Sequence, residues 1–349
     1  MKINQSNESL AAMGFPPVAQ VSSLPTIAHL FGTSKKRCGI YFLAFRVGLF
    51  YVGQAVDVVK RFAQHRRIHD DIVGFSFIPI PKTELDEAEK AFIFRAESLG
   101  IMLTNAVHVT SIVGDTDLDL VVSVAEQEAW LHASSRLSDS VANLPKVLLP
   151  DAQQLRFSKN FCRFEKHPLA KRALAIFKQY VCGCVPAPRL TEYSFWSASC
   201  MPSTNSNTWP RLLCVNAGVM ELFVAGWEKQ NSNVLWAFVN VAEDILLEHW
   251  ASLDELTATF PFVEIVRAGY RDAGQHQVRL HTRDGAPMER LLTDPGVSKA
   301  ASALVLRVMR KRATIYGKYH CVQLVNSALS DHDELHAASP HSAKICVDQ

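Results

Sequence analysis

The chain has 349 residues, of which 48% are apolar and 20% are charged, and its formal net charge is +2 at pH 7. At roughly 100–200 residues per domain, this length predicts two or three domains. The composition excludes a wholly disordered chain and a low-complexity fibre. No run of about 18 apolar residues occurs, so we expect no membrane-spanning helix. The first residues lack the features of a secretory signal, and we therefore expect a cytoplasmic protein without membrane association.

Eight cysteines are scattered along the chain. Cys182 and Cys184 lie close together, with a single residue between them, whereas paired zinc ligands are usually separated by about two to four residues. Disulfide scaffolds are typical of much shorter secreted chains. We therefore expect reduced and mostly buried thiols.

The first segment, residues 1–34, is expected to be a flexible lead, because its prolines interrupt any helix. A compact region begins at residue 35. The run GIYFLAF at residues 39–45 is short, apolar and aromatic, as in a buried strand. Residues 49–53 (LFYVG) predict a second strand, paired antiparallel with the first in a hairpin.

The elements that follow complete a small module. A helix is predicted after Asp57, whose carboxylate can accept a backbone N–H at the helix start. Residues 72–80 predict a third strand that ends at prolines, and residues 84–99 predict a second helix with an apolar stripe. We therefore predict an α/β (α+β) module over residues 35–110, with a three-stranded mixed or antiparallel sheet flanked by helices.

Three more segments are predicted beyond this module. Residues 111–185 are expected to be a helical extension or linker. Residues 186–327 carry short aromatic-rich runs separated by Ser, Asn, Pro and Gly clusters, which is typical of antiparallel strands joined by loops. We expect a larger α+β domain there, rich in antiparallel strands. Residues 328–349 are expected to be a disordered tail.

The module over residues 35–110 resembles the GIY-YIG nuclease superfamily. A Gly-Ile-Tyr run is followed, after nine residues, by a Tyr-Val-Gly run. An arginine, a histidine, a glutamate and an asparagine then follow in the order of the family signature. The resemblance covers about residues 36–108. The residues that carry it are Gly39, Ile40, Tyr41, Tyr51, Val52, Gly53, Arg61, His65, Glu89 and Asn105.

The resemblance implies a divalent-metal-dependent nuclease in which Glu89 holds Mg²⁺ or Mn²⁺. Phosphodiester hydrolysis needs charge relief on the phosphate, and a hard cation held by one or two carboxylates supplies it. Glu89 lies four residues after Leu85 and three before Phe92, so it shares the apolar face of its helix. A carboxylate in such a place is costly unless it is paired or metal-bound. Spacing alone leaves open a surface acid at the edge of the stripe.

A pair of basic residues lies on the first predicted helix. Arg61 and His65 are one turn apart and project from one face. Arginine can clamp a phosphate through two N–H donors, and histidine can bind the phosphate or shuttle a proton near neutral pH. A solvated basic face is the alternative. Lys60, Arg66 and Arg67 fit that alternative or contact flanking phosphates of a nucleic acid.

The resemblance assigns the two tyrosines to the active site. We predict Tyr41 as the base-like residue and Tyr51 as the group that orients water or phosphate. A tyrosine with a pKa near 10 needs help to act as a base at neutral pH, and an ordinary core tyrosine is the alternative. Gly39 and Gly53 are predicted to permit close approach of the backbone. Asn105 is given a structural role, in which it holds the site through hydrogen bonds.

Together these residues predict an endonuclease that cuts DNA by single-step attack of water on phosphorus, with Mg²⁺ or Mn²⁺ as cofactor. Restriction, defence or mobile-element processing is the expected setting. The domain over residues 186–327 would select the target. Its aromatic residues could form a stacking platform for bases or simply a core, and the basic stretch at residues 307–312 could follow a phosphate backbone or form a solvated face.

Several alternatives stay open at this point. The chain could be a DNA-repair nuclease, or a nucleic-acid-binding or interaction protein that kept the GIY-YIG fold with a silent or partner-gated site. RNA is not excluded as the substrate. A protein partner or a second copy of the chain could bind through residues 186–327.

Overall fold

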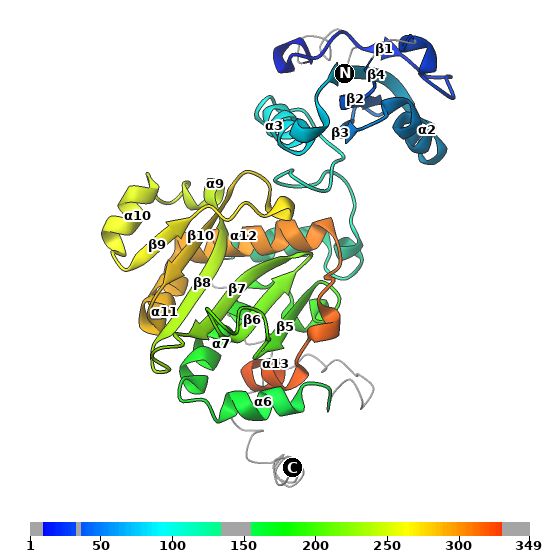
Figure 1. The fold of residues 1–349 in the computed structure, drawn as a ribbon. Coiled ribbons are helices and arrows are strands. Elements are labelled where there is room, and N and C mark those ends of the chain that lie inside the picture. Colours follow the sequence, from blue (N-terminus) through cyan, green and yellow to red (C-terminus); the bar gives the residue numbers. More distant parts are fainter. Residues whose placement is uncertain (1–9, 33–35, 134–154, 330–349) are drawn as a thin grey trace. The chain divides into compact units, whose positions relative to one another are not determined.

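The computed structural model describes residues 10–32, 36–133 and 155–329. The chain divides into two compact units, Met1–Gly114 and Asp115–Gln349, which are treated separately below (Figure 1). The chain is a mixed α+β protein with one antiparallel sheet in each unit. Most of the predicted tail, from residue 330 onward, lies outside the described residues.

The first unit is built on a four-stranded antiparallel sheet in the order β1-β4-β2-β3. The predicted strands at residues 39–45, 49–53 and 72–80 are confirmed, as are both predicted helices. The Asp57 carboxylate accepts hydrogen bonds from the backbone N–H groups of Val59 and Lys60, as expected of a helix start. The elements are β1 (Ala19–Gln20), η1 (Ala28–Leu30), β2 (Gly39–Phe45), β3 (Phe50–Ala55), α2 (Val58–Ile68), β4 (Ile72–Pro79), η2 (Lys82–Glu84) and α3 (Leu85–Ser98).

Strand β2 is buried along its whole length and contributes side chains to two hydrophobic clusters. Successive side chains of a strand point to opposite faces of the sheet. Ile40, Phe42 and Ala44 pack into the cluster that contains Leu85, Ile93 and Ala96 of α3. Tyr41, Leu43 and Phe45 pack into the cluster that contains Val58 and Phe62 of α2. The sheet therefore has α2 on one face and α3 on the other, which explains why the β2 sequence is apolar without alternation.

Part of the predicted flexible lead belongs to this unit. Leu10, Met13 and Phe15 are buried in the cluster on the α3 face. Ala19 and Gln20 form β1, which pairs with β4 and adds a fourth strand to the predicted three. The prolines do interrupt helix formation, but they leave an extended chain that can pair at a sheet edge. The sequence prediction missed this because such pairing depends on a partner more than fifty residues away.

The second unit is built on a six-stranded antiparallel sheet in the order β5-β6-β7-β8-β10-β9, whose strands lie side by side in Figure 1. The predicted antiparallel, strand-rich α+β architecture is thus confirmed for this region. Its elements are η3 (Asp117–Leu120), α4 (Val124–His132), α6 (Ser158–Glu165), α7 (Ala170–Cys184), α8 (Pro188–Thr191), β5 (Trp196–Cys200), β6 (Arg211–Ala217), β7 (Met220–Trp227), β8 (Leu235–Ala242), α9 (Glu243–Leu246), α10 (Leu253–Thr259), β9 (Val263–Val266), η5 (Arg271–Ala273), β10 (Gln277–Thr282), α11 (Gly285–Thr293), α12 (Pro295–Lys311), η6 (Gly317–Tyr319) and α13 (Val322–Leu329).

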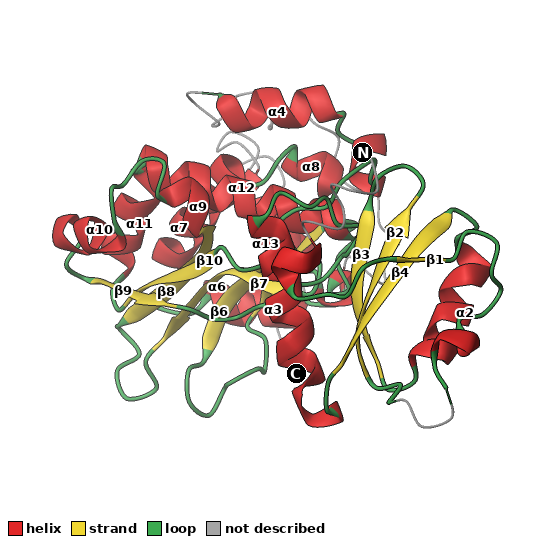
Figure 2. Cartoon of the chain, turned by 90° about the horizontal axis from the view of Figure 1, so that it is seen from above, coloured by secondary structure: helices red, strands yellow, loops and turns green. Residues whose placement is uncertain are grey.

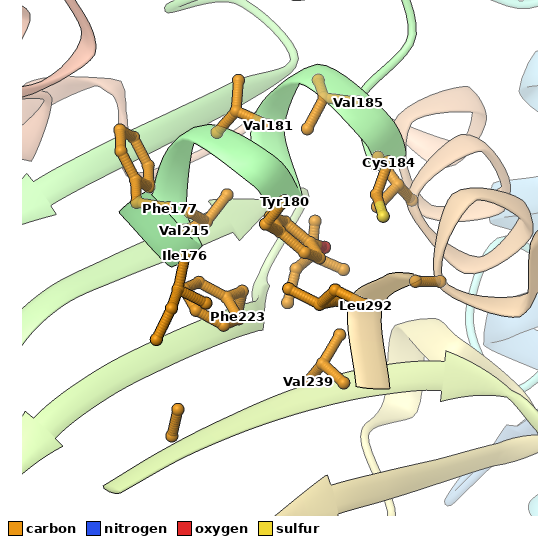
Figure 3. Close-up of a cluster of buried hydrophobic side chains, with 14 of the residues drawn as sticks. Ile176, Phe177, Tyr180, Val181, Cys184, Val185, Val215, Phe223, Val239 and Leu292 are labelled. Carbon is orange, nitrogen blue, oxygen red and sulfur yellow. The ribbon is translucent and has the colours of Figure 1, made fainter. Parts of the chain in front are cut away.

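Helices α7, α11 and α12 lie together on one side of this sheet (Figure 2). In the core between them, Tyr180 of α7 stacks on Phe223 of β7, with ring centroids 4.9 Å apart (Figure 3). Helix α7 falls within residues 111–185, which the sequence placed in an extension or linker. Since Ile176, Phe177 and Tyr180 are fully buried against the sheet, α7 is instead an integral part of the second unit.

A buried polar network lies beside β5, an edge strand of the second sheet. The Glu192 carboxylate accepts hydrogen bonds from Arg189 Nη1 at 3.0 Å and His320 Nε2 at 3.0 Å. The side chains of all three residues are at most 3% exposed. His320 Nδ1 accepts the backbone N–H of Ala198, so both ring nitrogens are engaged. These charges balance one another inside the core.

None of the helices in the described ranges is both long enough and apolar enough to cross a membrane.

Candidate active site

Strands β2 and β3 bring the two tyrosines of the sequence motif together. The pairing sets Tyr41 opposite Gly53 and Leu43 opposite Tyr51, so the tyrosines are diagonal neighbours on one face. Their ring centroids lie 6.0 Å apart. Both belong to the α2 face of the sheet.

The two tyrosines pack so closely against Gly53 that no larger residue fits at this position. A Cβ on Gly53 would lie 2.5 Å from Tyr51 Cε1 and 2.6 Å from the Tyr41 hydroxyl oxygen. Both tyrosines would have to move to admit it. Gly39 is needed for a different reason, because a Cβ there would overlap the carbonyl oxygen of Ile78 in the neighbouring strand. The predicted close approaches are therefore present at both glycines.

Helix α2 brings Arg61 and His65 to the Tyr41 hydroxyl. His65 Nε2 lies 2.8 Å from the hydroxyl oxygen, and Arg61 Nε donates to the same oxygen at 3.3 Å. The His65 ring also lies against Tyr51, with centroids 5.0 Å apart. Arg61 is exposed and its Nη1 donates to Gln64 Oε1 at 3.1 Å. Four of the predicted residues thus lie together around the Tyr41 hydroxyl, namely Tyr41, Tyr51, Arg61 and His65.

The environment decides which of these groups carries protons. Burial, Arg61 and His69 lower the pKa of His65 to about 4, so its imidazole is neutral at physiological pH. Burial and the neighbouring Tyr51 raise the pKa of Tyr41 far above its ordinary value. Arg61 donates to the Tyr41 oxygen, and the direction of the Tyr41–His65 bond follows the His65 tautomer: Nε2 accepts the Tyr41 O–H when the ring proton is on Nδ1, and donates when it is on Nε2.

These shifts revise the prediction that Tyr41 acts as the base. A tyrosine with a raised pKa holds its proton more tightly, and a base must give that proton away. His65, whose Nε2 faces the hydroxyl, is the neutral group of the pair that could accept this proton. Sequence reasoning could not place the proton, because both shifts come from burial in the folded chain.

Glu89 lies on the buried side of α3, as its spacing predicted. The buried residues of the helix are Leu85, Glu89, Ile93 and Ala96, which form one stripe. Glu89 is 6% exposed, which excludes the alternative of an exposed surface acid. This stripe packs on the face of the sheet opposite the tyrosines. A carboxylate so placed requires polar partners.

Gln54 is one of those partners. Its Nε2 donates to Glu89 Oε2 at 3.0 Å and to Asp86 Oδ1 at 2.6 Å. The sequence analysis gave Gln54 no role. The available signal was its position directly after Gly53, at the place where the motif ends.

Asn105 acts as an extra strand partner for β3. Its Oδ1 accepts the Val52 N–H at 3.1 Å, and its Nδ2 donates to the Val52 carbonyl oxygen at 2.6 Å. The side chain is 2% exposed. The structural role that the resemblance implied for Asn105 therefore has a direct counterpart in these hydrogen bonds.

The three basic residues predicted to contact nucleic acid differ from one another. Arg66 donates to the carbonyl oxygens of Val21, Asp70 and Ile72, at 2.6–3.1 Å. Its guanidinium therefore ties the N-terminal segment to the sheet, which is a structural role. Lys60 and Arg67 are exposed on α2, and their contact with nucleic acid stays a prediction.

The predicted residues thus fall into two groups that meet at strand β3. Tyr41, Tyr51, Arg61 and His65 lie on the α2 face, whereas Glu89 lies on the α3 face. The consecutive residues Gly53 and Gln54 contact one group each. Strand β3 is at the edge of the sheet, and residues 102–105 pair with its first half. The second half of β3 therefore joins the two groups.

The carboxylate oxygen atoms at and near Glu89 suit a hard divalent cation. The Glu89 carboxylate supplies oxygen ligands of the kind that Mg²⁺ and Mn²⁺ prefer, and the Asp86 carboxylate adds negative charge nearby. Within the described ranges, no three or more His, Cys, Asp or Glu residues converge to hold a metal by themselves. Water and a substrate phosphate would have to complete the coordination, as is usual for Mg²⁺.

The aromatic residues of the second unit mostly form its core. Trp196 is fully buried, and Trp236 is 3% exposed. Trp209 differs, since it is 44% exposed while its ring lies edge-on to Trp236 at 5.8 Å. Among the aromatic residues that were predicted to form either a stacking platform or a core, namely Phe195, Trp196, Trp209, Trp227, Trp236 and Trp250, Trp209 is exposed and could stack on a base.

The basic stretch on α12 is engaged in ion pairs. Arg307 forms a two-bond pair with Asp244, and Arg310 pairs with Asp119. Arg312 contacts Asp272. Of the two predictions for this stretch, a phosphate-binding track is not favoured, because these guanidinium groups are already paired with carboxylates.

No model of a known protein family, no curated protein and no solved structure matched this chain.

Proposed function

We propose that the chain is a divalent-metal-dependent endonuclease that hydrolyses phosphodiester bonds in DNA. The observation that carries this proposal is the position of the Tyr41 hydroxyl, held between Arg61 and His65 and close against the backbone of Gly53. This places an imidazole and a cation at one hydroxyl group. The GIY-YIG resemblance of the sequence supports the same reading.

The proposed step uses Tyr41 and His65 as a relay. A water molecule gives a proton to the Tyr41 oxygen while the Tyr41 proton passes to His65 Nε2. The resulting hydroxide attacks phosphorus, the new P–O bond forms, and the bond to the leaving oxygen breaks. That oxygen takes a proton from solvent. A neutral His65 suits this step, because an imidazolium could not accept the proton.

Arg61 and Glu89 have separate tasks in the proposal. Arg61 is exposed and can turn a guanidinium edge toward a phosphate, since such pairs form two parallel hydrogen bonds. Glu89 would hold Mg²⁺ or Mn²⁺, with Asp86 nearby. The bound cation would neutralise charge that develops on the phosphate.

The second unit is proposed to select the target. A small catalytic unit has little surface for this task, and Trp209 offers one exposed aromatic ring on which a base could stack. Trp209→Ala should weaken binding of a single-stranded oligonucleotide by about tenfold. Unchanged binding in a fluorescence-anisotropy titration would remove Trp209 from the proposal.

The test compares wild type with Glu89→Ala and Arg61→Ala on supercoiled plasmid, linear duplex and single strands. Mg²⁺, Mn²⁺ and a chelator are the three conditions, and Glu87→Gln, which changes an exposed acid on the same helix, is the control. We expect wild type and the control to cut, and both other variants to lose at least about a hundredfold in rate. Metal-dependent cutting that survives in both variants would refute the site.

A second function is favoured by one observation. The Tyr41 side chain is only 1% exposed, with its hydroxyl enclosed by two neighbours. A site closed in this way also fits a nucleic-acid-binding protein that is silent or opens only with a partner. Binding of DNA or RNA without cleavage in any of the metals would select this function.

A further inference from the structure

Gln54 is anchored at the centre of the candidate site. Its backbone is fixed by pairing with Ile40 of the central strand, directly after the pair formed by Gly53 and Tyr41. Its half-buried side chain reaches helix α3 on the other face of the sheet. One short segment of β3 thus sets the position of both groups of residues.

The amide of Gln54 lies between two carboxylates. Nε2 is 2.6 Å from Asp86 Oδ1 and 3.0 Å from Glu89 Oε2, and each of its two hydrogens can serve one carboxylate. The opposite orientation of the amide would direct its oxygen at two anions. Asp86 and Glu89 are three residues apart, so both project toward β3 from the same side of α3.

We infer that Gln54 is a positioning residue, which holds the Glu89 carboxylate in the orientation that binds a divalent cation. This inference rests on the proposed function. Glutamate has several rotatable bonds, and a side chain that is already ordered does not lose that freedom when the cation binds. Pairing with β2 fixes the backbone of Gln54, and the two hydrogen bonds from its amide fix the side chains of Asp86 and Glu89 on α3.

The inference predicts a specific effect on metal binding. Loss of one hydrogen bond to a charged group is worth roughly 1 kcal/mol, which corresponds to about a fivefold change in affinity. Gln54→Met keeps the length of the side chain and removes both donors. The alternative, in which the amide occupies the position of the cation itself, predicts the opposite sign, because its removal would open that position between two carboxylates.

The experiment uses the full chain and Mn²⁺ as the probe. Electron paramagnetic resonance measures Mn²⁺ binding without nucleic acid, and a cleavage assay measures the Mn²⁺ concentration that gives half-maximal rate. For Gln54→Met we expect both values to rise about fivefold, while the rate at saturating Mn²⁺ stays within about twofold of wild type. Unchanged or tighter Mn²⁺ binding overturns the inference, as does a wild type that binds no Mn²⁺ at millimolar concentration.

Two further variants distinguish the effect of losing the Gln54 hydrogen bonds from the effect of losing a negative charge. Asp86→Asn removes one negative charge but keeps an oxygen that can accept from Gln54, and Glu87→Gln removes an exposed charge from the same turn of α3. We expect these two variants to behave alike, and both to bind Mn²⁺ more tightly than Gln54→Met. A larger loss in Asp86→Asn than in Gln54→Met would make Asp86 a metal ligand and overturn the assignment.

The outcomes distinguish this inference from the proposed function. If wild type binds Mn²⁺ more tightly than Gln54→Met but cuts no substrate, Gln54 positions Glu89 in a protein that is not a nuclease under these conditions. If wild type cuts and Gln54→Met matches it in both measurements, the endonuclease stands and the role of Gln54 falls. Circular dichroism of each variant confirms that the comparison is made on folded protein.

Discussion

The two units differ in how their functional or buried charged side chains are placed and paired. In the second unit, Arg189, Glu192 and His320 are buried together and balance one another. In the first unit, Arg61 is exposed beside a tyrosine hydroxyl, while Glu89 is buried on the other face of the sheet. A closed network of this kind stabilises or specifies a fold, whereas an exposed guanidinium such as that of Arg61 is suited to bind something else. The following predictions test that contrast.

The largest effect on stability is expected in the closed network. Glu192→Gln leaves the buried Arg189 charge without its carboxylate, and should cost about 3–5 kcal/mol of unfolding free energy. All six tryptophans of the sequence lie in the second unit, so urea unfolding followed by tryptophan fluorescence reports on this unit. The activity of the folded fraction should not change. A loss below about 1 kcal/mol would show that the network is not structural.

A smaller effect, on activity, is expected at Gly53 of the first unit, where the two tyrosines pack against the backbone. Gly53→Ala forces Tyr41 and Tyr51 apart and should lower the cleavage rate about a hundredfold, because displacements near 1 Å cost that much. The same chemical change at Gly183, in α7, meets no atom within 4 Å. Gly183→Ala should keep full activity and stabilise the second unit by up to about 1 kcal/mol. Equal activities of the two variants would contradict the need for a glycine at position 53.

Asn105 supports the edge strand, and its loss should cost stability in the first unit. Asn105→Leu removes two hydrogen bonds to Val52, for an expected loss of about 2 kcal/mol. Thr104→Val is the control, because the backbone N–H of Thr104 still bonds the Phe50 carbonyl oxygen after its hydroxyl is removed. Hydrogen exchange of the β3 backbone amides measures the stability of this strand in both variants. Equal protection in the two variants would refute the role of Asn105.

The smallest effect concerns pH. His65 has a pKa near 4 in the folded chain and about 6.5 when unfolded, so the unfolded state binds more protons between these values. Its contribution to stability is therefore complete above about pH 6.5 and is lost as the pH falls toward 4. Since His65 is half-buried, we expect only about 1 kcal/mol between pH 7 and pH 5.

Two measurements check this pH dependence. An NMR titration of the His65 ring should give a pKa well below 6, and thermal unfolding at pH 7 and pH 5 should depend less on pH in His65→Gln than in wild type. A ring that titrates near 6.5 would mean that His65 is not neutral for the reason given, and would remove it as the proton acceptor.

Local patterns were sufficient to predict most elements of the first unit and the buried side of Glu89. The Asp57 cap, the apolar run of β2 and the spacing around Glu89 act over a few residues, and each is visible in the sequence. The same patterns located the strands of the second unit. They missed β1, which depends on its distant partner β4, and they predicted the helix of α7 without showing that it packs on the sheet of the second unit.

The sequence by itself determined the helices, the main strands and the residues from which the proposed site is built. Tertiary structure alone decided how these residues are grouped and which of them hold protons. The Tyr41–His65 contact joins residues 24 positions apart, and the Gln54–Glu89 contact joins residues 35 positions apart. Such contacts depend on strand register and helix packing, and the pKa shifts depend on the burial that results. Neither quantity is encoded in a short window of sequence.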